Sequence, residues 1–293
     1  MAFDFVFLLL LGALLGSSFV LMKASVASLS VFMTVFLRLA IALAILLVAT
    51  KCQKMKLPPL MDLGFWLVRG VLGFSANILP FGLITWAEIY IETNLASLYM
   101  ATIPLFSLVL AHATTSDEKM TANRIFGMVV GFLGVVVLLY EPNASFAAGL
   151  LPQLACILAA LLYAASRVLT KRVAMYEPLI VSCAVTFCAT IVMAPFALPF
   201  LPSAIDGATY KSLLAVLLLG IFPTACAFVI LYHLIRTVGA VFQTSVNYLV
   251  PCFGFLWGYL VYSETPSRFM WFAIALIFFG MYRANKLDSI SDT

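Results

Sequence analysis

Charged and histidine side chains are scarce in this chain of 293 residues. Asp, Glu, Lys and Arg make up only 10% of the residues, and there are two histidines. Soluble domains carry roughly 25% charged residues, because their surfaces face water. The shortage excludes a soluble globular domain and a disordered chain. The few charges are scattered rather than clustered, so nucleic acid is not an expected partner.

Motifs for cofactor or metal chemistry are also missing. The six cysteines form no Cys-x-x-Cys pair, and His112 and His233 share no cluster of ligands. The sequence has no Walker lysine loop, which argues against ATP as the driver. No loop carries a nucleophile with a nearby base. We therefore expect no cofactor, no metal site and no catalytic residue, so the protein is not expected to be an enzyme.

Apolar residues fill most of the sequence. They account for 65% of the chain, and the mean hydropathy is +1.14. A membrane-spanning helix needs about 20 mostly apolar residues. Charges, Gly, Pro, Asn and Asp divide the chain into such segments and leave only short loops. The predicted fold class is an all-α integral membrane protein in the lipid bilayer. Its ten transmembrane helices are expected at residues 5–22, 30–50, 65–87, 93–112, 124–140, 149–169, 179–200, 210–232, 239–262 and 267–284.

A cleaved signal peptide is the alternative interpretation of the first apolar segment. Residues 1–22 include Asp4 but no Lys or Arg, so the basic N-terminal region of a signal peptide is missing. We therefore expect this segment to be the first span.

Lysines and arginines indicate the orientation. With a cytoplasmic N-terminus, the inside loops and tail hold ten of them. The outside loops hold three, namely Lys23, Lys211 and Arg268. Cytoplasmic loops carry an excess of these residues. The distribution therefore predicts an even number of spans with both termini cytoplasmic.

The second half of the chain repeats the first at an offset of about 147 residues. Each half holds five predicted spans, and an odd number turns the second copy upside down in the membrane. Inverted repeats are typical of secondary transporters. The expected units are residues 1–142 and 149–286, followed by a short cytoplasmic tail at 287–293. The matched features are Ser18–Lys23 with Ser166–Lys171, Pro104 with Pro251, Glu118 with Glu264, and Gly134 with Gly280.

Several short motifs occur in a fixed order. They are Gly16-Ser17-Ser18-Phe19-Val20 with Lys23, Arg38-Leu39-Ala40, Asn94-Leu95-Ala96-Ser97-Leu98, Ala101-Thr102-Ile103-Pro104-Leu105-Phe106, and the glycines Gly127, Gly131 and Gly134. Over nearly the whole chain, this set resembles the EamA-like transporters of the drug/metabolite transporter superfamily. The resemblance implies a central substrate cavity between the halves. It also implies movement of small organic metabolites, often outward transport of amino acids or related compounds.

Three charged residues are candidates for charge recognition or coupling. Arg38 lies about nine residues inside its span, so it should face the protein interior and have a partner. Glu88 and Glu92 replace apolar and small polar residues of the family pattern, and their spacing puts them on one helix face. As a pair near Lys23 or Arg38 they would attract cationic groups or protons. The alternative is a structural ion pair at a solvated helix end. Proton coupling and facilitated flux both stay open.

Polar and aromatic residues inside the spans are candidates for substrate contacts. Amides also join helices, and aromatic residues also favour the membrane interface. Arg167 fits a carboxylate through its guanidinium, or it belongs to the positive cytoplasmic side. Asn247 is the strongest single candidate. The full set of cavity candidates is Asn77, Tyr99, Tyr163, Arg167, Gln243, Asn247, Tyr248 and Trp257.

Prolines and glycines mark candidate hinges and close contacts. Prolines within spans remove a backbone hydrogen bond, so they act as moving hinges or as static kinks. These are Pro80, Pro104, Pro223 and Pro251. The pairs Gly12/Gly16, Gly127/Gly131 and Gly254/Gly258 have the spacing that permits close helix packing, here within one chain. A monomer or a homodimer is expected.

Together these features predict a multi-pass secondary transporter in a bacterial inner membrane. It would move small organic metabolites by alternating access and export amino acids or related compounds. One alternative is uptake of a vitamin, a nucleoside or a similar nutrient by the same fold. Another is a membrane-embedded enzyme or an assembly factor.

Overall fold

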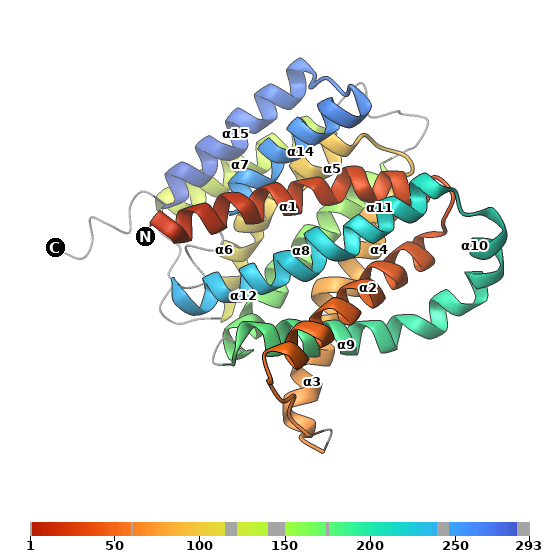
Figure 1. The fold of residues 1–293 in the computed structure, drawn as a ribbon. Coiled ribbons are helices and arrows are strands. Elements are labelled where there is room, and N and C mark those ends of the chain that lie inside the picture. The colour runs from red at the N-terminus through yellow and green to blue at the C-terminus, as the bar shows by residue number, and fades with distance from the viewer. Residues whose placement is uncertain are drawn as a thin grey trace.

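The computed structural model describes residues 2–59, 61–114, 122–139, 150–173, 176–238 and 246–285. Within these ranges the chain forms helices and no strands (Figure 1). Side chains cap the N-termini of several helices, among them α2 and α3. Ser30 accepts a hydrogen bond from the Met33 N–H at the start of α2, and Asp62 accepts one from the Phe65 N–H at the start of α3. Such caps satisfy backbone donors that have no partner within the helix.

Helices of the first half follow the predicted apolar segments closely. Two of these segments are built from several helical pieces in succession, because the helical geometry changes near a proline. The elements are α1 (Ala2–Val26), α2 (Val31–Cys52), α3 (Leu63–Leu72), η1 (Gly73–Ile78), α4 (Leu79–Ala87), α5 (Thr93–Tyr99), η2 (Met100–Thr102), α6 (Ile103–Thr114) and α7 (Ala122–Leu139).

Helices of the second half follow in the same order. The beginning of the predicted segment 239–262 lies outside the described residues up to residue 245. The elements are α8 (Leu151–Val173), α9 (Pro178–Ala197), η4 (Leu198–Phe200), α10 (Leu201–Gly207), α11 (Tyr210–Gly220), η5 (Ile221–Cys226), α12 (Ala227–Thr237), α14 (Val246–Tyr262) and α15 (Arg268–Asn285).

Five helical stretches in the described part are long and apolar enough to cross a membrane. Shorter apolar helices accompany them, and the count of ten spans stays a prediction. The beginning of α1 and the end of α15 lie at the same end of the bundle (Figure 1). The five stretches are Asp4–Val26, Val31–Cys52, Leu63–Ala87, Pro178–Gly207 and Tyr210–Thr237.

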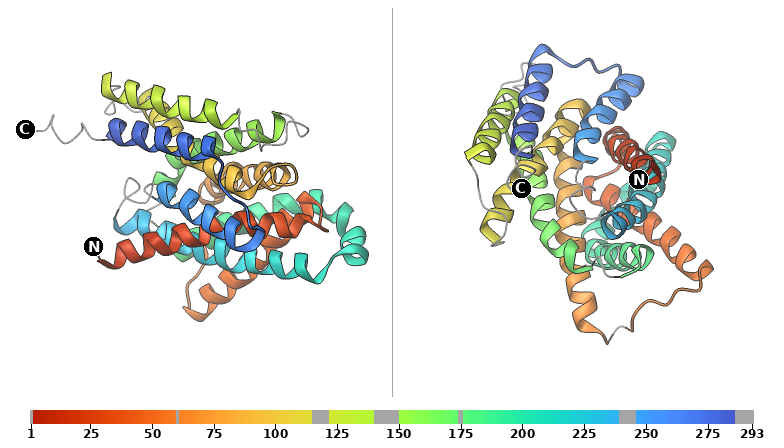
Figure 2. Two further views of the ribbon diagram at one scale, coloured as in Figure 1. Left: turned by 90° about the horizontal axis from the view of Figure 1, so that it is seen from above. Right: turned by 90° about the vertical axis from the view of Figure 1, so that its left-hand side faces the viewer.

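The two halves of the chain pack against each other along most of their helices. Four helices of the first half each pack on a helix of the second half: α1 on α14, α2 on α9, α4 on α8 and α7 on α15. Helix α6 of the first half also packs on α8, and α11 of the second half packs on both α1 and α2. Figure 2 shows α7 and α15 together at one side of the bundle and α3 at the other. Among the described residues, every hydrophobic core cluster combines side chains from both halves.

Glycines permit the closest approaches between the halves. A Cβ atom on Gly16 of α1 would lie 2.6 Å from the Cβ of Phe253 on α14. A Cβ on Gly280 of α15 would come within van der Waals overlap of the Gly127 carbonyl oxygen on α7. The glycines with this spacing therefore serve packing within the chain, as small residues do at membrane-helix interfaces.

Candidate functional site

A cavity of about 170 Å³ lies between helices of both halves of the chain. An engineered protein cavity of about 150 Å³ holds benzene, so this space suits a small organic molecule. Most of its wall is aliphatic or aromatic, with a few polar groups, which is the usual make-up of a ligand site. The lining residues are Leu15, Ser18, Phe19, Met22, Arg38, Ala76, Asn77, Phe81, Ile84, Met100, Ile103, Tyr163, Ser166, Pro223, Phe228, Leu231, Tyr232, Ile235, Val246, Asn247 and Val250.

Arg38 supplies the positive charge of the cavity wall. Its side chain is 1% exposed, and its guanidinium lies 3.5 Å from the ring centroid of Phe81. The Nε atom donates a hydrogen bond of 3.1 Å to the hydroxyl of Thr224, and Nη1 lies 3.5 Å from the sulfur of Met22. Within the described residues Nη2 makes no hydrogen bond, so the guanidinium keeps donor capacity for a ligand.

Asn77 adds a second donor to the same wall. It lies in η1, is 3% exposed, and its Nδ2 atom has no hydrogen-bond partner among the described residues. A buried donor without a partner is costly, and a ligand can remove that cost. Arg38 and Asn77 both line the cavity, and each has a side-chain N–H group without a partner among the described residues. Such a pair of donors suits an oxygen acceptor, above all a carboxylate.

Two serines of the cavity wall occupy matching places in the repeat. Ser18 of α1 and Ser166 of α8 both line the cavity. Each hydroxyl donates to a carbonyl of its own helix, at 2.6 Å to Leu15 and 2.8 Å to Leu162. Sequence reasoning did not select either serine as a site residue. The repeat offset was the signal that pointed to them.

Helical geometry changes where the third predicted span of each half meets the cavity. The π-helical segments η1 and η5 begin 148 residues apart, at Gly73 and Ile221. Within η5, Pro223 has no N–H to donate to the Leu219 carbonyl. The Thr224 hydroxyl donates to that carbonyl instead, at 2.7 Å, while it accepts from Arg38. Such π segments are frequent at functional sites.

The other three predicted hinge prolines lie outside the cavity wall. Pro80 follows η1 directly at the start of α4, and Pro104 follows the 3₁₀ turn η2 at the start of α6. Pro251 lies inside α14. Movement at any of the four prolines, including Pro223, stays a prediction.

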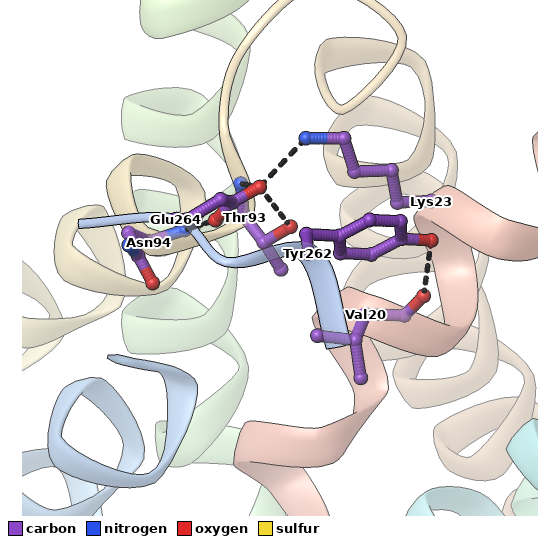
Figure 3. Close-up of polar contacts among 6 residues, drawn as sticks. All are labelled: Val20, Lys23, Thr93, Asn94, Tyr262 and Glu264. Atoms are coloured by element: carbon purple, nitrogen blue, oxygen red, sulfur yellow. Dashed lines mark hydrogen bonds and ion pairs between the residues drawn. The ribbon is translucent and has the colours of Figure 1, made fainter. Parts of the chain in front are cut away.

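An ion pair connects α1 to the loop after α14 (Figure 3). Lys23 Nζ of α1 lies 2.8 Å from Glu264 Oε1, in the loop after α14. The same carboxylate accepts hydrogen bonds from the N–H and hydroxyl of Thr93, at 3.2 and 2.9 Å, and from the N–H of Asn94 at 3.0 Å. Glu264 thus caps the N-terminus of α5 from the loop that follows α14. It joins α1, α5 and α14.

Glu88 and Glu92 do not share one helix face, which corrects the prediction from their spacing. Helix α4 ends at Ala87, Glu88 is its C-cap, and Glu92 is the N-cap of α5 after a turn. The ion-pair partner of Lys23 is Glu264. Glu88 is 1% exposed, and both its carboxylate oxygens have no hydrogen-bond partner among the described residues.

The remaining predicted site residues fall into three groups. Tyr163 and Asn247 line the cavity together with Arg38, Asn77 and Pro223. Tyr99 and Trp257 are not part of the cavity wall. The Tyr99 hydroxyl bonds Gln153 at 2.6 Å, and the Trp257 indole N–H donates to the Ala13 carbonyl at 3.2 Å. The side chains of Arg167, Gln243 and Tyr248 lie outside the described residues.

A second buried arginine stands apart from the cavity. The Arg69 guanidinium lies 3.8 Å from the Phe65 ring centroid and 4.4 Å from that of Tyr176. Its Nη1 donates to the Phe65 carbonyl at 3.0 Å. Cation–π contacts of this kind stabilise a buried guanidinium. Arg69 is therefore enclosed by aromatic rings, while its Nε and Nη2 have no hydrogen-bond partner among the described residues.

Apolar helices from two matching halves around a shared cavity define the architecture of a membrane carrier. The chain belongs to the EamA-like transporter family, whose model matches residues 4–140 and again residues 150–285. The same family model thus matches both halves of the chain.

Curated relatives are transporters by name. A "Probable terminal-alkyne amino-acid exporter" of Streptantibioticus cattleyicolor is 28% identical, over 85% of this chain and 82% of the relative. An "Uncharacterized transporter" of Archaeoglobus fulgidus is 26% identical over 91% and 93%. The "Uncharacterized inner membrane transporter YedA" of Escherichia coli K12 is 24% identical over 91% and 85%. A crystal structure 21% identical aligns with a TM-score of 0.69 over 98% of both chains, which shows the fold alone.

Proposed function

We propose that this protein is a secondary carrier that exports amino acids or related small carboxylates across a bacterial inner membrane by alternating access. Family membership supports the transport class. One relative is named an amino-acid exporter, and another is named an inner membrane transporter.

One observation carries the substrate class. A cavity built by both halves holds a buried arginine and a buried amide with unused donors, set in an apolar wall. Arg38 and Asn77 would hold the carboxylate, and Tyr163 and Asn247 would contact the rest of the molecule. An arginine fork binds carboxylates with two parallel bonds when both its nitrogens are available.

The proposed topology follows from the sequence. Residues 1–142 and 149–286 would each cross the membrane five times with opposite orientation, and the tail 287–293 would be cytoplasmic. Repeats of this kind give two related conformations, each open to one side. The protein would work as a monomer or a homodimer.

Counterflow in liposomes tests the function. The purified protein is reconstituted with a high internal concentration of one metabolite, and uptake of the same labelled metabolite is followed. We expect transient accumulation for amino acids or related carboxylates, because exchange needs no gradient and no assumed direction. Arg38→Gln should abolish it, whereas Arg69→Lys should keep it.

Other outcomes would overturn the proposal. Counterflow of a vitamin or a nucleoside, without any carboxylate, would replace the substrate class by that of the uptake alternative. No exchange of any metabolite by folded protein would favour the enzyme or assembly-factor alternative.

A further inference from the structure

Two acidic residues, Glu88 and Glu264, are found where α4 ends and α5 begins. Glu264 holds Lys23 and caps α5 with both its oxygens (Figure 3). Glu88 is more deeply buried and uses neither oxygen in a hydrogen bond within the described residues. The side chain of Lys23 is 28% exposed, so it has room to shift.

Glu88 is connected to the cavity wall through its own helix, and its charge interacts with that of Lys23. It follows Ile84 of the cavity wall by four residues, which is one helical turn. Lys23 directly follows Met22, another residue of the wall. A change in the charge of Glu88 is therefore felt at both the cavity and the ion pair. The groups whose charges act on Glu88, or on which its charge acts, are Lys23 of α1, Arg38 of α2, Cys156 of α8, Tyr262 of α14 and Glu264 after α14.

Burial decides which form of Glu88 suits this arrangement. An ionised carboxylate without hydrogen bonds in a buried place is costly, whereas the neutral acid costs much less. The nearby positive charge of Lys23 is already engaged by Glu264. Glu88 therefore suits a proton in this conformation. Arg38 also favours the anion, and ionisation would become more favourable when Lys23 turns towards Glu88.

We propose that Glu88 is a proton-binding site that controls opening of this end of the cavity. The proposal rests on the transport function above and adds its control. Glu88 gives its proton to water at this end, becomes an anion and draws Lys23 away from Glu264. Glu264 then loses its ion pair, and the joint between α1, α5 and α14 weakens. Return of the proton restores the pair of Lys23 with Glu264 and closes the end.

Distances between spin labels test this without a substrate. Ala27→Cys, directly after α1, and Phe269→Cys, at the start of α15, are exposed positions that follow Lys23 and Glu264 by four and five residues. They are labelled in a full chain whose six native cysteines are replaced, in lipid nanodiscs. From pH 5 to pH 9 we expect the longer-distance population to grow at least about fivefold, a typical size for coupling between two sites.

Variants separate the proton site from a general effect of pH. Glu88→Gln should keep the short distance at every pH, and Glu264→Gln should show the long distance even at pH 5. Glu177→Gln removes an exposed carboxylate at the N-cap of α9 and should behave as the unmodified chain. Distances that do not change with pH, or a Glu88→Gln variant that still changes with pH, overturn the proposal.

A folding failure of Glu88→Gln does not end the test. Glu88→Asp keeps a carboxyl group and moves it, so the pH of half-change should shift, and an unchanged midpoint overturns the proposal. Counterflow gives a separate result. If metabolites are exchanged but the distances do not depend on pH, only the proposed role of Glu88 is wrong. If the distances depend on pH but no metabolite is exchanged, the proposed transport function is wrong.

Discussion

At the scale of single residues, Arg38 combines burial with unused hydrogen-bonding capacity. Its contacts within the chain are one hydroxyl, one sulfur and one aromatic face, and none of them carries a negative charge. Arg38→Lys keeps the charge but loses the fork. We expect KM for a carboxylate substrate to rise at least about tenfold, because charge-assisted hydrogen bonds contribute about 1.5–3 kcal/mol. The concentration dependence of counterflow measures this.

Arg69→Lys is the matched control for that change. It also replaces a buried arginine, but one enclosed by Phe65 and Tyr176 away from the cavity wall. The thermal stability should fall while KM stays the same. Equal increases in KM for both variants would mean that Arg38 acts only through folding.

Glu177 provides a pH effect outside the apolar segments. It is the N-cap of α9 and forms an ion pair with Arg236 at the end of α12. The hydrogen bond from Arg236 lowers the pKa of the Glu177 carboxyl. A lowered pKa in the folded state means stabilisation that is present above the unfolded pKa, about 4.3, and lost as pH falls through the folded value.

Glu177→Gln should therefore lower Tm slightly at pH 7, by no more than about 2 °C, because exposed ion pairs contribute little. The difference from the unmodified chain should vanish as the pH falls below about 4. Thermal unfolding in detergent at several pH values measures this. A difference that persists at acid pH would show that the carboxylate charge is not the cause.

At the scale of secondary-structure elements, η5 connects the backbone to the cavity. Thr224 donates to the carbonyl that Pro223 leaves without an N–H, and it accepts from Arg38. Thr224→Val removes both bonds. We expect the free energy of unfolding to fall by about 1–3 kcal/mol, since buried polar groups lose their partner. Chemical denaturation measures the stability, and counterflow should show a raised KM as well.

Pro223→Ala tests the same element in the opposite direction. Alanine restores the missing N–H and permits a regular α-helix, so transport should slow if the irregular geometry is needed. Pro195→Ala in α9, which does not line the cavity, is the matched control and should leave the rate unchanged. Equal transport rates for both variants would show that η5 is a static kink that transport does not need.

At the scale of the whole molecule, stability depends on contact between the two halves. Gly280 lets α15 approach α7 so closely that a methyl group would overlap the Gly127 carbonyl. Gly280→Ala should therefore lower the unfolding free energy by about 1–3 kcal/mol or more. A Cβ on Gly82 of α4 would meet no described atom within 4 Å outside its own stretch of helix. Gly82→Ala should stabilise by about 0.5–1 kcal/mol. Denaturant unfolding of both variants measures the contrast.

Helix positions could be predicted from the sequence because lipid imposes long apolar runs, and prolines and charges interrupt them. The repeat could be predicted from matched features such as Pro104 and Pro251. The capping of α5 by Glu264 could not, because these residues are about 170 positions apart. The relation between Glu88 and Glu92 was predicted wrongly for a different reason. Their spacing of four residues fits one helix face, although the predicted spans 65–87 and 93–112 already left residues 88–92 between two helices.

The placement of Arg38 in only one half has a consequence for stoichiometry. At the repeat offset, the second half carries Val185 and Thr186, which have no charge. A single guanidinium can anchor a single carboxylate, and the cavity of about 170 Å³ has no second such anchor in its wall of described residues. Each cycle would therefore carry one molecule, held by the same helix α2 on both sides of the membrane. Exchange should then rise hyperbolically with concentration, without cooperativity.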